Sequence, residues 1–590
     1  MENTSTRAGP KDFSHLYSRV TKNRAQSKIK SFYKYFAIPG IGQLAGGLPN
    51  AKYFPYDTLE AKAALPNRWT PSEASVKEHG GKAKSPPESH LVVPHVANTT
   101  DATRKIDLTT ALQYGTAQGY PPLYGFIKEF TTRCLHPSIP YEGGADIVLT
   151  VGSTDGFSKA LQCFNNEWSE GVNPVSEREG LIVEEFAYMN AIQSARPRGM
   201  NILPIAMDDE GMLAKGPGGL DDALENWDFS KGKRPHLMYS VTIGQNPTSG
   251  TLSTPRRKEI YAVCQKYDVI IVEDDPYWYL QYPSTQKEPV AKPEKSSGFA
   301  FLDSLQPSYL SIDVDGRVVR LDTFSKTVAP GCRLGWITAS PAIIERLTRI
   351  TESSTQQPSG FVQSMIAELL IGPAKDGLGS GGRKDGTGWD MSGWVRWLEG
   401  LRGEYERRMD TMATILEKGR TKIKSGRRQS FTQMMMDTQL QEQEGDAQSD
   451  WAVIETTPLY DFYRPTGGMF LWLSVRFENH PLAGKVAGPR LAMALWVYWT
   501  TEPYKVLVGP GTMFAPNEEI AEEKAWKYFR LCFAAAPVEE LSSISKGFVK
   551  GIGAFFEIKD AKKIDDILKD LDGIETAAER EGMGCIAGWC

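Results

Sequence analysis

Short runs of β-branched and aliphatic residues alternate with longer segments of helical character between about residues 105 and 345, and this alternation restricts the fold more than any other feature. The runs lie at 147–150, 181–183, 237–240, 269–272 and 317–321. Near-continuous apolar strands separated by helices are typical of a mostly parallel sheet covered on both faces, so we predict an α/β fold. Because ligands bind beyond the carboxyl ends of such strands, the residues that follow each run are the first candidates for a site.

The composition is that of a globular protein, since 41% of the 590 residues are hydrophobic and 24% are charged. The 67 basic and 72 acidic residues give a formal charge of −5, which argues against nucleic acid or an anionic membrane as partner. No stretch reaches the ~18 apolar residues of a membrane-spanning helix. The seven cysteines form no CxxC pair and the seven histidines no ligand-like cluster, so we expect reduced thiols and no metal site.

The N-terminus contains no apolar segment of the signal-peptide type. Its first 30 residues carry seven Lys or Arg side chains against Glu2 and Asp12, which is a weak mitochondrial signal. We expect a cytoplasmic protein, with a mitochondrial location as the less favoured alternative.

Changes in composition along the chain predict three insertions. Residues 70–100 are rich in Pro, Ser, His and Lys without a helical or strand period, residues 372–390 hold seven glycines, and residues 425–450 are rich in Gln, Asp and Ser. The predicted parts of the chain are an N-terminal arm or lid over 1–45, part of a smaller domain over 46–104, the large domain over 105–350, a linker helix with the rest of the smaller domain over 351–557, and a charged, helical C-terminal extension over 558–590.

Polar residues of different chemistry follow four of the runs. In chain order they are Ser153 and Thr154, then Asn246, then Asp274 and Tyr277, and last Lys326 with Arg333. Ser153 also opens a segment with a helical pattern, so backbone N–H groups at that point would face a bound phosphate. A lysine alone after a strand is more often a solvated side chain. Together, an acid, an amide, a phenol, a lysine, an arginine and a helix N-terminus are the groups that a pyridoxal phosphate site requires.

In this setting the sequence resembles the fold-type I pyridoxal-phosphate aminotransferases. It is most similar to the subgroup of fungal aromatic amino acid aminotransferases and kynurenine/2-aminoadipate aminotransferases, over residues 12–556 apart from the insertions. The motifs are LAGGLPN at 44–50, ALQY at 111–114, GST at 152–154, NPT at 246–248, DDPY at 274–277, SK at 325–326 with Arg333, and YFR at 528–530. The resemblance implies a large cofactor-binding domain with a seven-stranded type of sheet between helices, and a smaller α+β domain formed by N- and C-terminal segments.

The resemblance implies a role for each residue around the cofactor ring. Lys326 would bond covalently to the cofactor and later move the proton at the substrate α-carbon. Asp274 would pair with the pyridine nitrogen and keep it protonated. Tyr277 and Asn246 would hydrogen-bond the 3′-oxygen. Tyr188 would cover one face of the ring, with a core tyrosine as the alternative.

The cofactor phosphate would be held by hydroxyls and by a guanidinium, which supplies paired donors. These residues are Ser153, Thr154, Thr323, Ser325 and Arg333. For Thr323 an ordinary loop hydroxyl is a nearly equal alternative, and many relatives have Gln in place of Thr154. Tyr114 would reach the phosphate bound to the partner subunit, so each site of a homodimer would need two chains.

Substrate binding is implied for four residues. Arg530 would clamp the α-carboxylate that amino acids and 2-oxo acids share, beside the backbone of Gly47 and the side chain of Asn246. Arg24 belongs to a segment that resembles the N-terminal lid of the nearest relatives. It would accept the distal carboxylate of 2-aminoadipate or 2-oxoglutarate, with a solvated basic helix turn as an equal alternative.

We therefore expect a pyridoxal-phosphate-dependent aminotransferase that uses phenylalanine, tyrosine and tryptophan as donors. Kynurenine and 2-aminoadipate, the latter a compound of lysine biosynthesis, are further candidate donors. The acceptors would be 2-oxoglutarate or aromatic 2-oxo acids, in a ping-pong cycle through pyridoxamine phosphate. A carbon–sulfur β-lyase on the same fold is the alternative, because it would share every cofactor contact.

Overall fold

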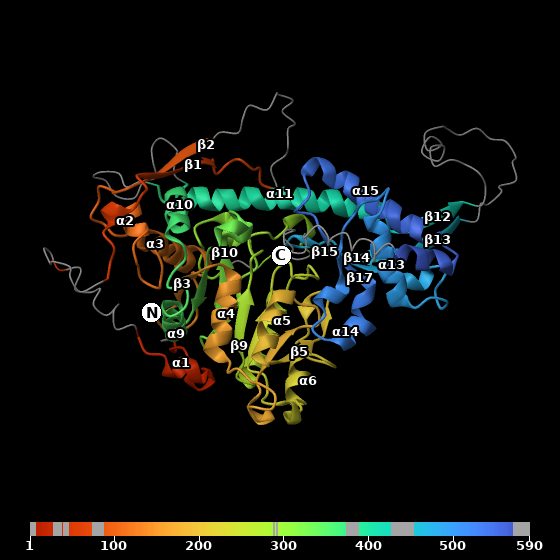
Figure 1. Ribbon diagram of the computed structural model, residues 1–590, viewed down its shortest axis with the longest axis horizontal. Helices are drawn as coiled ribbons and strands as arrows, with labels where there is room; N and C mark the ends of the chain where they lie inside the picture. The colour runs from red at the N-terminus through yellow and green to blue at the C-terminus, as the bar shows by residue number, and fades with distance from the viewer. Residues whose placement is uncertain are drawn as a thin grey trace, which may run out of the picture. The chain divides into compact units, whose positions relative to one another are not determined.

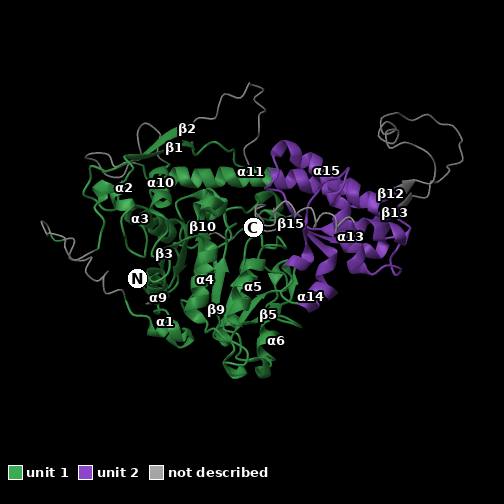
Figure 2. Cartoon of the chain, in the orientation of Figure 1, with its two compact units in different colours: residues 1–407, 465–470, 514–517 green, residues 408–464, 471–513, 518–590 purple. Residues whose placement is uncertain are grey.

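The computed structural model describes residues 7–26, 38, 47–72, 88–286, 290, 293–372, 389–425 and 454–569. The chain forms two compact units (Figure 2). Unit 1 comprises residues 1–407, 465–470 and 514–517, and unit 2 comprises residues 408–464, 471–513 and 518–590. Along the chain, the first boundary falls within the long helix α11 (Asp390–Gly419).

Unit 1 contains a seven-stranded sheet (Figure 1). Its strands, in spatial order, are β3 (Asp146–Thr150), β11 (Gly335–Ala339), β10 (Val318–Thr323), β9 (Ile270–Asp274), β8 (Leu237–Ser240), β4 (Gly180–Glu184) and β5 (Asn201–Ile205). All neighbouring pairs are parallel except those of β11, which runs antiparallel to both β10 and β3. The predicted mostly parallel α/β sheet is confirmed.

Helices cover this sheet on both faces (Figure 1). On one face, α7 (Thr254–Lys266) contributes Ile260 to a buried cluster with Ile271 of β9. On the other, α4 (Ser153–Phe164) lies so close to β10 that a Cβ on Gly156 would be 3.1 Å from Leu321. The remaining helices of unit 1 are α1 (Arg19–Asn23), α2 (Leu108–Ala111), α3 (Pro121–Phe130), α5 (Met189–Ala195), α6 (Leu220–Glu225), α8 (Ala300–Asp303), α9 (Pro341–Glu352) and α10 (Gly360–Leu370).

Five of the seven strands coincide with the predicted runs, and two, β5 and β11, were not predicted. In each of these two strands a residue interrupts the apolar run: Pro204 in β5 and Thr338 in β11. β5 lies at the edge of the sheet, where proline is tolerated because one side of the strand makes no ladder hydrogen bonds. Thr338 lies in a strand that is buried along its whole length.

The described part of residues 46–104 belongs to unit 1, although it was expected in the smaller domain. Strands β1 (Thr58–Ala64) and β2 (Glu88–Pro94) pair antiparallel. Leu91 and Val93 of β2 share one buried core with Ile366 and Leu370 of α10. This shared core, which the sequence pattern does not reveal, explains why the pair of strands groups with the large sheet.

Strand β2 also corrects the expectation that residues 70–100 lack a strand. Ser89, Leu91 and Val93 are buried, whereas Glu88 and His90 are exposed and Val92 is partly buried. This is the period of two that a half-buried strand requires. The polar Ser89 in a buried position conceals the pattern in the sequence.

Unit 2 is the smaller α+β unit. Its four-stranded sheet has the order β14 (Tyr460–Phe462), β15 (Phe470–Val475), β17 (Tyr528–Cys532) and β16 (Gly509–Pro510). Helices α13 (Gly488–Thr500) and α15 (Val538–Phe555) pack through Trp499, whose ring stacks on Phe548 at 4.5 Å and whose Nε1 donates to the Phe548 carbonyl at 3.1 Å. The other elements are β12 (Thr421–Ser425), β13 (Ile454–Pro458) and α14 (Glu518–Glu523).

The predicted insertions at 372–390 and 425–450 lie almost entirely outside the described residues. Most of the lid motif after Arg24 lies outside them as well. In the C-terminal extension, residues 561–569 are helical, as predicted, and the chain beyond 569 is outside the described part. No helix within the described ranges is long and apolar enough to cross a membrane.

Candidate active site

Asp274 lies at the carboxyl end of β9, where the predicted residues were expected to gather. The parallel register pairs it with Leu321 of β10, so the segment that leads to Lys326 leaves the sheet beside it. The side chain is buried, and its Oδ2 accepts a 2.7 Å hydrogen bond from the hydroxyl of Tyr239 in neighbouring β8. Its Oδ1 is buried as well, and it has no hydrogen-bond partner among the described residues.

Burial raises the pKa of Asp274 from 3.8 to about 6. The hydroxyls of Tyr239 and Ser153 lower this pKa, and the neighbouring carboxylates Asp275 and Asp322 raise it. The Ser153 hydroxyl lies close enough to Asp274 to lower its pKa, although it has no well-aligned hydrogen-bond partner among the described residues. An opposite charge at Oδ1 would favour the ionised form of Asp274. The position therefore fits a protonated ring nitrogen.

A buried charge network beside Asp274 was not found by sequence reasoning. The guanidinium of Arg320 donates to both oxygens of Asp322 at 3.0 Å and lies 3.1 Å from Glu273 and 3.3 Å from Asp275. All four side chains are buried. A second buried guanidinium, that of Arg257, lies 3.6 Å from Glu273, so two cations face three carboxylates around the strand end. The available signal was Arg320 and Asp322 in an otherwise apolar strand, because charged residues are buried only when paired.

Lys326 ends the 3₁₀ turn η10 (Phe324–Lys326), which follows β10 directly. Thr323 caps this turn: its Oγ1 accepts the N–H of Ser325 at 3.2 Å and lies 2.9 Å from the Ser325 hydroxyl. Phe324 is fully buried against Trp336. A cap and an aromatic anchor therefore hold the lysine at the sheet edge. The Thr323 hydroxyl thus stabilises the turn itself, which agrees with the alternative that it is an ordinary loop hydroxyl.

Arg333 lies over the turn that precedes α4. Its Nη2 donates to the carbonyl of Val151 at 3.2 Å. A Cβ on Gly152 would be 2.6 Å from the same nitrogen, and Gly152 has a φ of +91°, so this position requires glycine. A guanidinium above the N-terminus of a twelve-residue helix forms an anion site. The structure thus brings together Ser153, Thr154 and Arg333, three of the residues predicted at the phosphate.

The turn that carries Lys326 and the turn that precedes α4 are linked by the residues at the start of β11. Thr323 Oγ1 donates to the carbonyl of Leu334 at 3.2 Å. The next residue, Gly335, lies so close to Gly152 that an added Cβ would be 3.2 Å from its Cα. Thr323 and Ser325 therefore lie near the turn before α4, where the phosphate is predicted.

Three further residues predicted around the ring lie in loops at the same edge. Asn246 is buried in the loop after β8, and Tyr277 is buried after β9 with its ring 5.9 Å from Phe470. Burial, Asp274 and then Tyr188 raise the pKa of Tyr239, which places Tyr188 near the Tyr239–Asp274 pair. Tyr188 is only partly buried. This exposure suits a residue that covers a ligand better than a core tyrosine.

Tyr114 and Gly47 lie in neighbouring segments of unit 1. Gln113 Nε2 donates to the carbonyl of Pro49 at 2.8 Å, which holds the segment of Gly47 beside Tyr114. The Tyr114 side chain is 59% exposed. An added Cβ on Gly47 would meet nothing within 4 Å, so no contact in the described chain requires glycine there.

Arg24 directly follows α1 and contacts the C-terminal end of α9. Its Nη1 donates to the hydroxyl of Ser353, and its carbonyl accepts from Arg349 at 2.9 Å. Its Nε is buried and has no hydrogen-bond partner among the described residues. Arg24 is thus partly buried and in contact with α9, and its role toward a substrate carboxylate stays a prediction.

Arg530 belongs to unit 2, whereas the other predicted site residues belong to unit 1. It lies in β17 opposite Gly509 of β16 and is partly buried. Two residues earlier in β17, Tyr528 stacks on Trp472 of β15 with ring centroids 5.2 Å apart, which helps to hold this strand in place.

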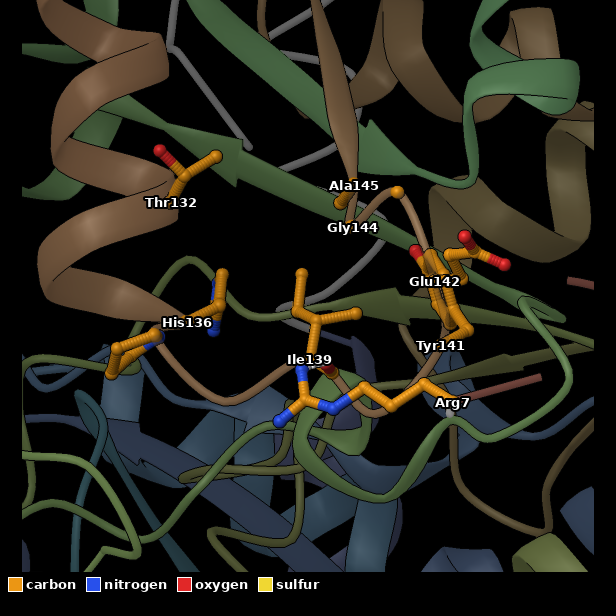
Figure 3. Close-up of a pocket in the computed structure, with 10 residues that line it drawn as sticks. Arg7, Thr132, His136, Ile139, Tyr141, Glu142, Gly144 and Ala145 are labelled. Carbon is orange, nitrogen blue, oxygen red and sulfur yellow. Dashed lines mark hydrogen bonds between the residues drawn. The ribbon is translucent and has the colours of Figure 1, made fainter. Parts of the chain in front are cut away.

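A separate hollow of about 540 Å³ in unit 1 contains none of the predicted residues (Figure 3). It is lined by Arg7, Thr132, His136 and the turn that leads into β3, and Arg7 donates to the Ile139 carbonyl at 2.7 Å. Burial lowers the pKa of His136 well below its ordinary value. In the described ranges, no group of three His, Cys, Asp or Glu side chains is placed to hold a metal ion.

The donor set at the sheet edge fits pyridoxal 5′-phosphate. The unpartnered oxygen of Asp274 suits the ring nitrogen, and the Arg333 guanidinium above the start of α4 suits the phosphate. Lys326 follows β10, and β10 is the neighbour of β9, the strand that ends at Asp274. At this position an amine can bond to the aldehyde of the cofactor.

Comparisons with known proteins agree with this chemistry. Residues 86–439 match the family described as aminotransferase class I and II. An aromatic amino acid aminotransferase of Schizosaccharomyces pombe is 32% identical over 91% of this chain and 96% of the relative. An L-tyrosine:2-oxoglutarate aminotransferase of Tapinella panuoides is 32% identical over 80% of this chain and 75% of the relative. The crystal structure of aminotransferase Aro8 from Candida albicans, 29% identical, matches with a TM-score of 0.71 over 94% of this chain and 100% of that one.

Proposed function

The chain belongs to the class I and II aminotransferase family, and we propose that it transfers the amino group of phenylalanine, tyrosine and tryptophan to 2-oxoglutarate or an aromatic 2-oxo acid. The observation that carries the proposal is the buried carboxylate of Asp274, which has one unpartnered oxygen and lies on the strand next to the one that leads to Lys326. The names of the similar proteins, for aromatic amino acid and tyrosine transamination, support this choice of donors.

Bound pyridoxal 5′-phosphate supplies an electron-accepting ring that stabilises negative charge at the substrate α-carbon. Lys326 moves the proton at that carbon, because a positioned amine can accept it as general base and return it as general acid. Asp274 holds a proton on the ring nitrogen, since the carboxylate thereby gains the cationic partner that its Oδ1 lacks. Tyr239 keeps Oδ2 in place.

The other residues bind and orient. Arg333 and the N–H groups at the start of α4 hold the phosphate. The hydroxyls of Ser153 and Thr154, and those of Thr323 and Ser325, add further hydrogen bonds to it in this proposal. Asn246 and Tyr277 donate to the 3′-oxygen, and Tyr188 covers one face of the ring and keeps water away from it. Arg530 binds the α-carboxylate in this proposal, and the Gly47 backbone takes part in the same binding. Because donor and acceptor share this carboxylate, one arginine serves both halves of the cycle.

The active form in this proposal is a homodimer, in which Tyr114 completes the phosphate site of the partner subunit. The exposure of the Tyr114 side chain supports this, because a tyrosine with more than half of its surface in solvent is available to a second chain. Tyr53, which is 82% exposed, lies in the same N-terminal part of unit 1. Exposed aromatic side chains of this kind are enriched in protein interfaces.

Arg24 extends the proposal to donors with a second carboxylate, such as 2-aminoadipate. A carboxylate is a stronger acceptor for a guanidinium than the Ser353 hydroxyl that Arg24 now contacts, and it can also pair with the buried Nε. Kynurenine, an aromatic amino acid, falls within the main donor class. The β-lyase alternative is not favoured, because the similar proteins are named as aminotransferases.

A half-reaction screen tests the proposal. The protein with its cofactor in the aldehyde form is mixed with one amino acid at a time, without acceptor, and conversion to the amine form is followed by absorbance. Aromatic donors should convert it fastest, and Asp274→Asn should slow them by about a hundredfold or more. A preference for aspartate or alanine over every aromatic donor would contradict the substrate class. Release of pyruvate and ammonia from a donor with a β-leaving group, in place of a stable oxo acid, would favour the lyase.

A further inference from the structure

Lys159 is a buried lysine in the second turn of α4, and the mechanism above gives it no role. Its residue is 1% exposed. Its Nζ lies 2.5 Å from Oδ2 of Asp155 and 3.0 Å from the hydroxyl of Thr355. Burial lowers the pKa of Lys159, and the charge of Asp155 raises it. A lysine is almost never buried to this extent unless it is paired, so Asp155 is the reason that a cation is held here.

Asp155 in turn shapes the start of the helix. It lies in the first turn of α4, and its Oδ2 accepts the N–H of Val151 at 2.9 Å. The carbonyl of Val151 accepts from Arg333. Val151 is therefore held from both sides, by a carboxylate and a guanidinium. These two contacts fix the turn before α4. The N–H groups that come next, at the start of the helix, face the predicted phosphate position.

The same carboxylate presents an electrostatic problem. A bound phosphate and an ionised Asp155 would be two anions within one turn of the same helix N-terminus, and like charges at this range repel. The side chain of Asp155 is only 19% exposed, so water screens it poorly. Lys159 supplies the opposite charge from the interior side of the helix, where it does not compete with Arg333 for the phosphate.

We propose that Lys159 is a positioning residue for the cofactor phosphate. It neutralises Asp155, so that this carboxylate can orient Val151 without repelling the phosphate. The role rests on the proposed function, because it requires pyridoxal phosphate at the start of α4. Lys159 acts through Asp155, and its amine is already occupied by Asp155 and Thr355.

The test compares two ligands that differ only in the phosphate. Cofactor-free protein is titrated with pyridoxal phosphate and with pyridoxal, and the Kd of each is measured by tryptophan fluorescence. In Lys159→Met, Asp155 loses its cation, so the Kd for pyridoxal phosphate should rise about 10- to 100-fold. The Kd for pyridoxal should change less than about threefold, since Lys326 and the ring contacts are unaltered. A merely structural role would weaken both ligands equally, and that result would overturn the proposal.

A double variant provides the matched control. Asp155→Asn with Lys159→Met replaces the ion pair by neutral side chains of similar volume, and the asparagine oxygen can still accept the Val151 N–H. The wild-type preference for pyridoxal phosphate over pyridoxal should return to within about threefold. If Lys159→Met does not fold, the double variant alone tests the proposal. Loss of its preference for pyridoxal phosphate over pyridoxal would contradict charge neutralisation as the role of Lys159. Failure of the wild-type protein to bind pyridoxal phosphate would contradict the proposed function instead.

Discussion

The hydroxyl of Tyr239 donates a 2.7 Å hydrogen bond to Oδ2 of Asp274, across two neighbouring parallel strands. Both side chains are buried, so water does not compete for this bond. The bond fixes one oxygen of the carboxylate and leaves the other, Oδ1, without a partner among the described residues. The position of the ring nitrogen in the proposed mechanism depends on this asymmetry.

Removal of the Tyr239 hydroxyl should therefore slow the chemical step. Tyr239→Phe leaves Oδ2 of Asp274 without its donor, which weakens the ionised form that pairs with the ring nitrogen. We expect kcat with tyrosine to fall about tenfold while KM changes less than about threefold, as for an interaction that matters most in the transition state. Steady-state kinetics would measure both constants.

Tyr261→Phe is the matched control for this variant. The hydroxyl of Tyr261 in α7 donates to Asp313 at 3.0 Å. This is a second buried tyrosine–aspartate pair, and Asp313 lies just before the start of β10, at the end of that strand away from the proposed site. Its loss should lower stability by about 1 kcal/mol and leave kcat unchanged. Equal losses of kcat in the two variants would show that the effect of Tyr239 is only structural.

The stability of the cofactor-free protein should depend on the ionisation of Asp274. Its folded pKa of about 6 lies above the ordinary 3.8, so the folded state binds the proton more tightly than the unfolded chain does. The resulting stabilisation is complete below about pH 4 and is lost as the pH rises through about 6, with a total of about 3 kcal/mol. The free energy of unfolding of Asp274→Asn should therefore fall less over this range than that of the wild type. Identical pH profiles, measured by denaturant unfolding, would refute the assignment.

The shared site of the proposed homodimer can be tested by mixing two inactive variants. Tyr114→Ala removes the side chain supplied to the partner, and Lys326→Ala removes the lysine of the chain's own site. A heterodimer of the two has one site with both defects and one with neither, so activity should return toward a quarter of the wild-type value, about 25%, at equal mixing. No recovery after verified subunit exchange would argue against a site built from two chains.

Arg24 should affect donors with a second carboxylate selectively. In Arg24→Ala, the half-reaction with 2-aminoadipate should slow about tenfold or more, while that with phenylalanine should stay within about threefold, because only the former presents a distal acceptor. Ser353→Ala is the control, since it removes the hydroxyl that Arg24 contacts and keeps the guanidinium. Equal slowing of both donors in Arg24→Ala would mean that Arg24 only fixes the N-terminal segment to α9.

The sequence predicts the strands and the residues at their ends because both are local properties. An apolar run of β-branched residues forms a strand wherever it is buried, and Asp274 and Lys326 take their places from their positions after such runs. The Tyr239–Asp274 bond was not predictable in this way, because it joins residues 35 positions apart through the register of β8 and β9. The charges around Arg320 likewise depend on which strands are neighbours, as does the packing of β2 on α10.

Borohydride reduction of the protein with bound pyridoxal phosphate, followed by peptide mapping, tests the central claim most directly. Reduction fixes the cofactor to the lysine that bonds with its aldehyde, so the labelled residue marks the active site without any assumption about substrate. We predict a pyridoxyl group on Lys326 and its loss in Lys326→Ala, in a protein that still folds and binds the cofactor. A pyridoxyl label on any other lysine of the wild-type chain would contradict the account.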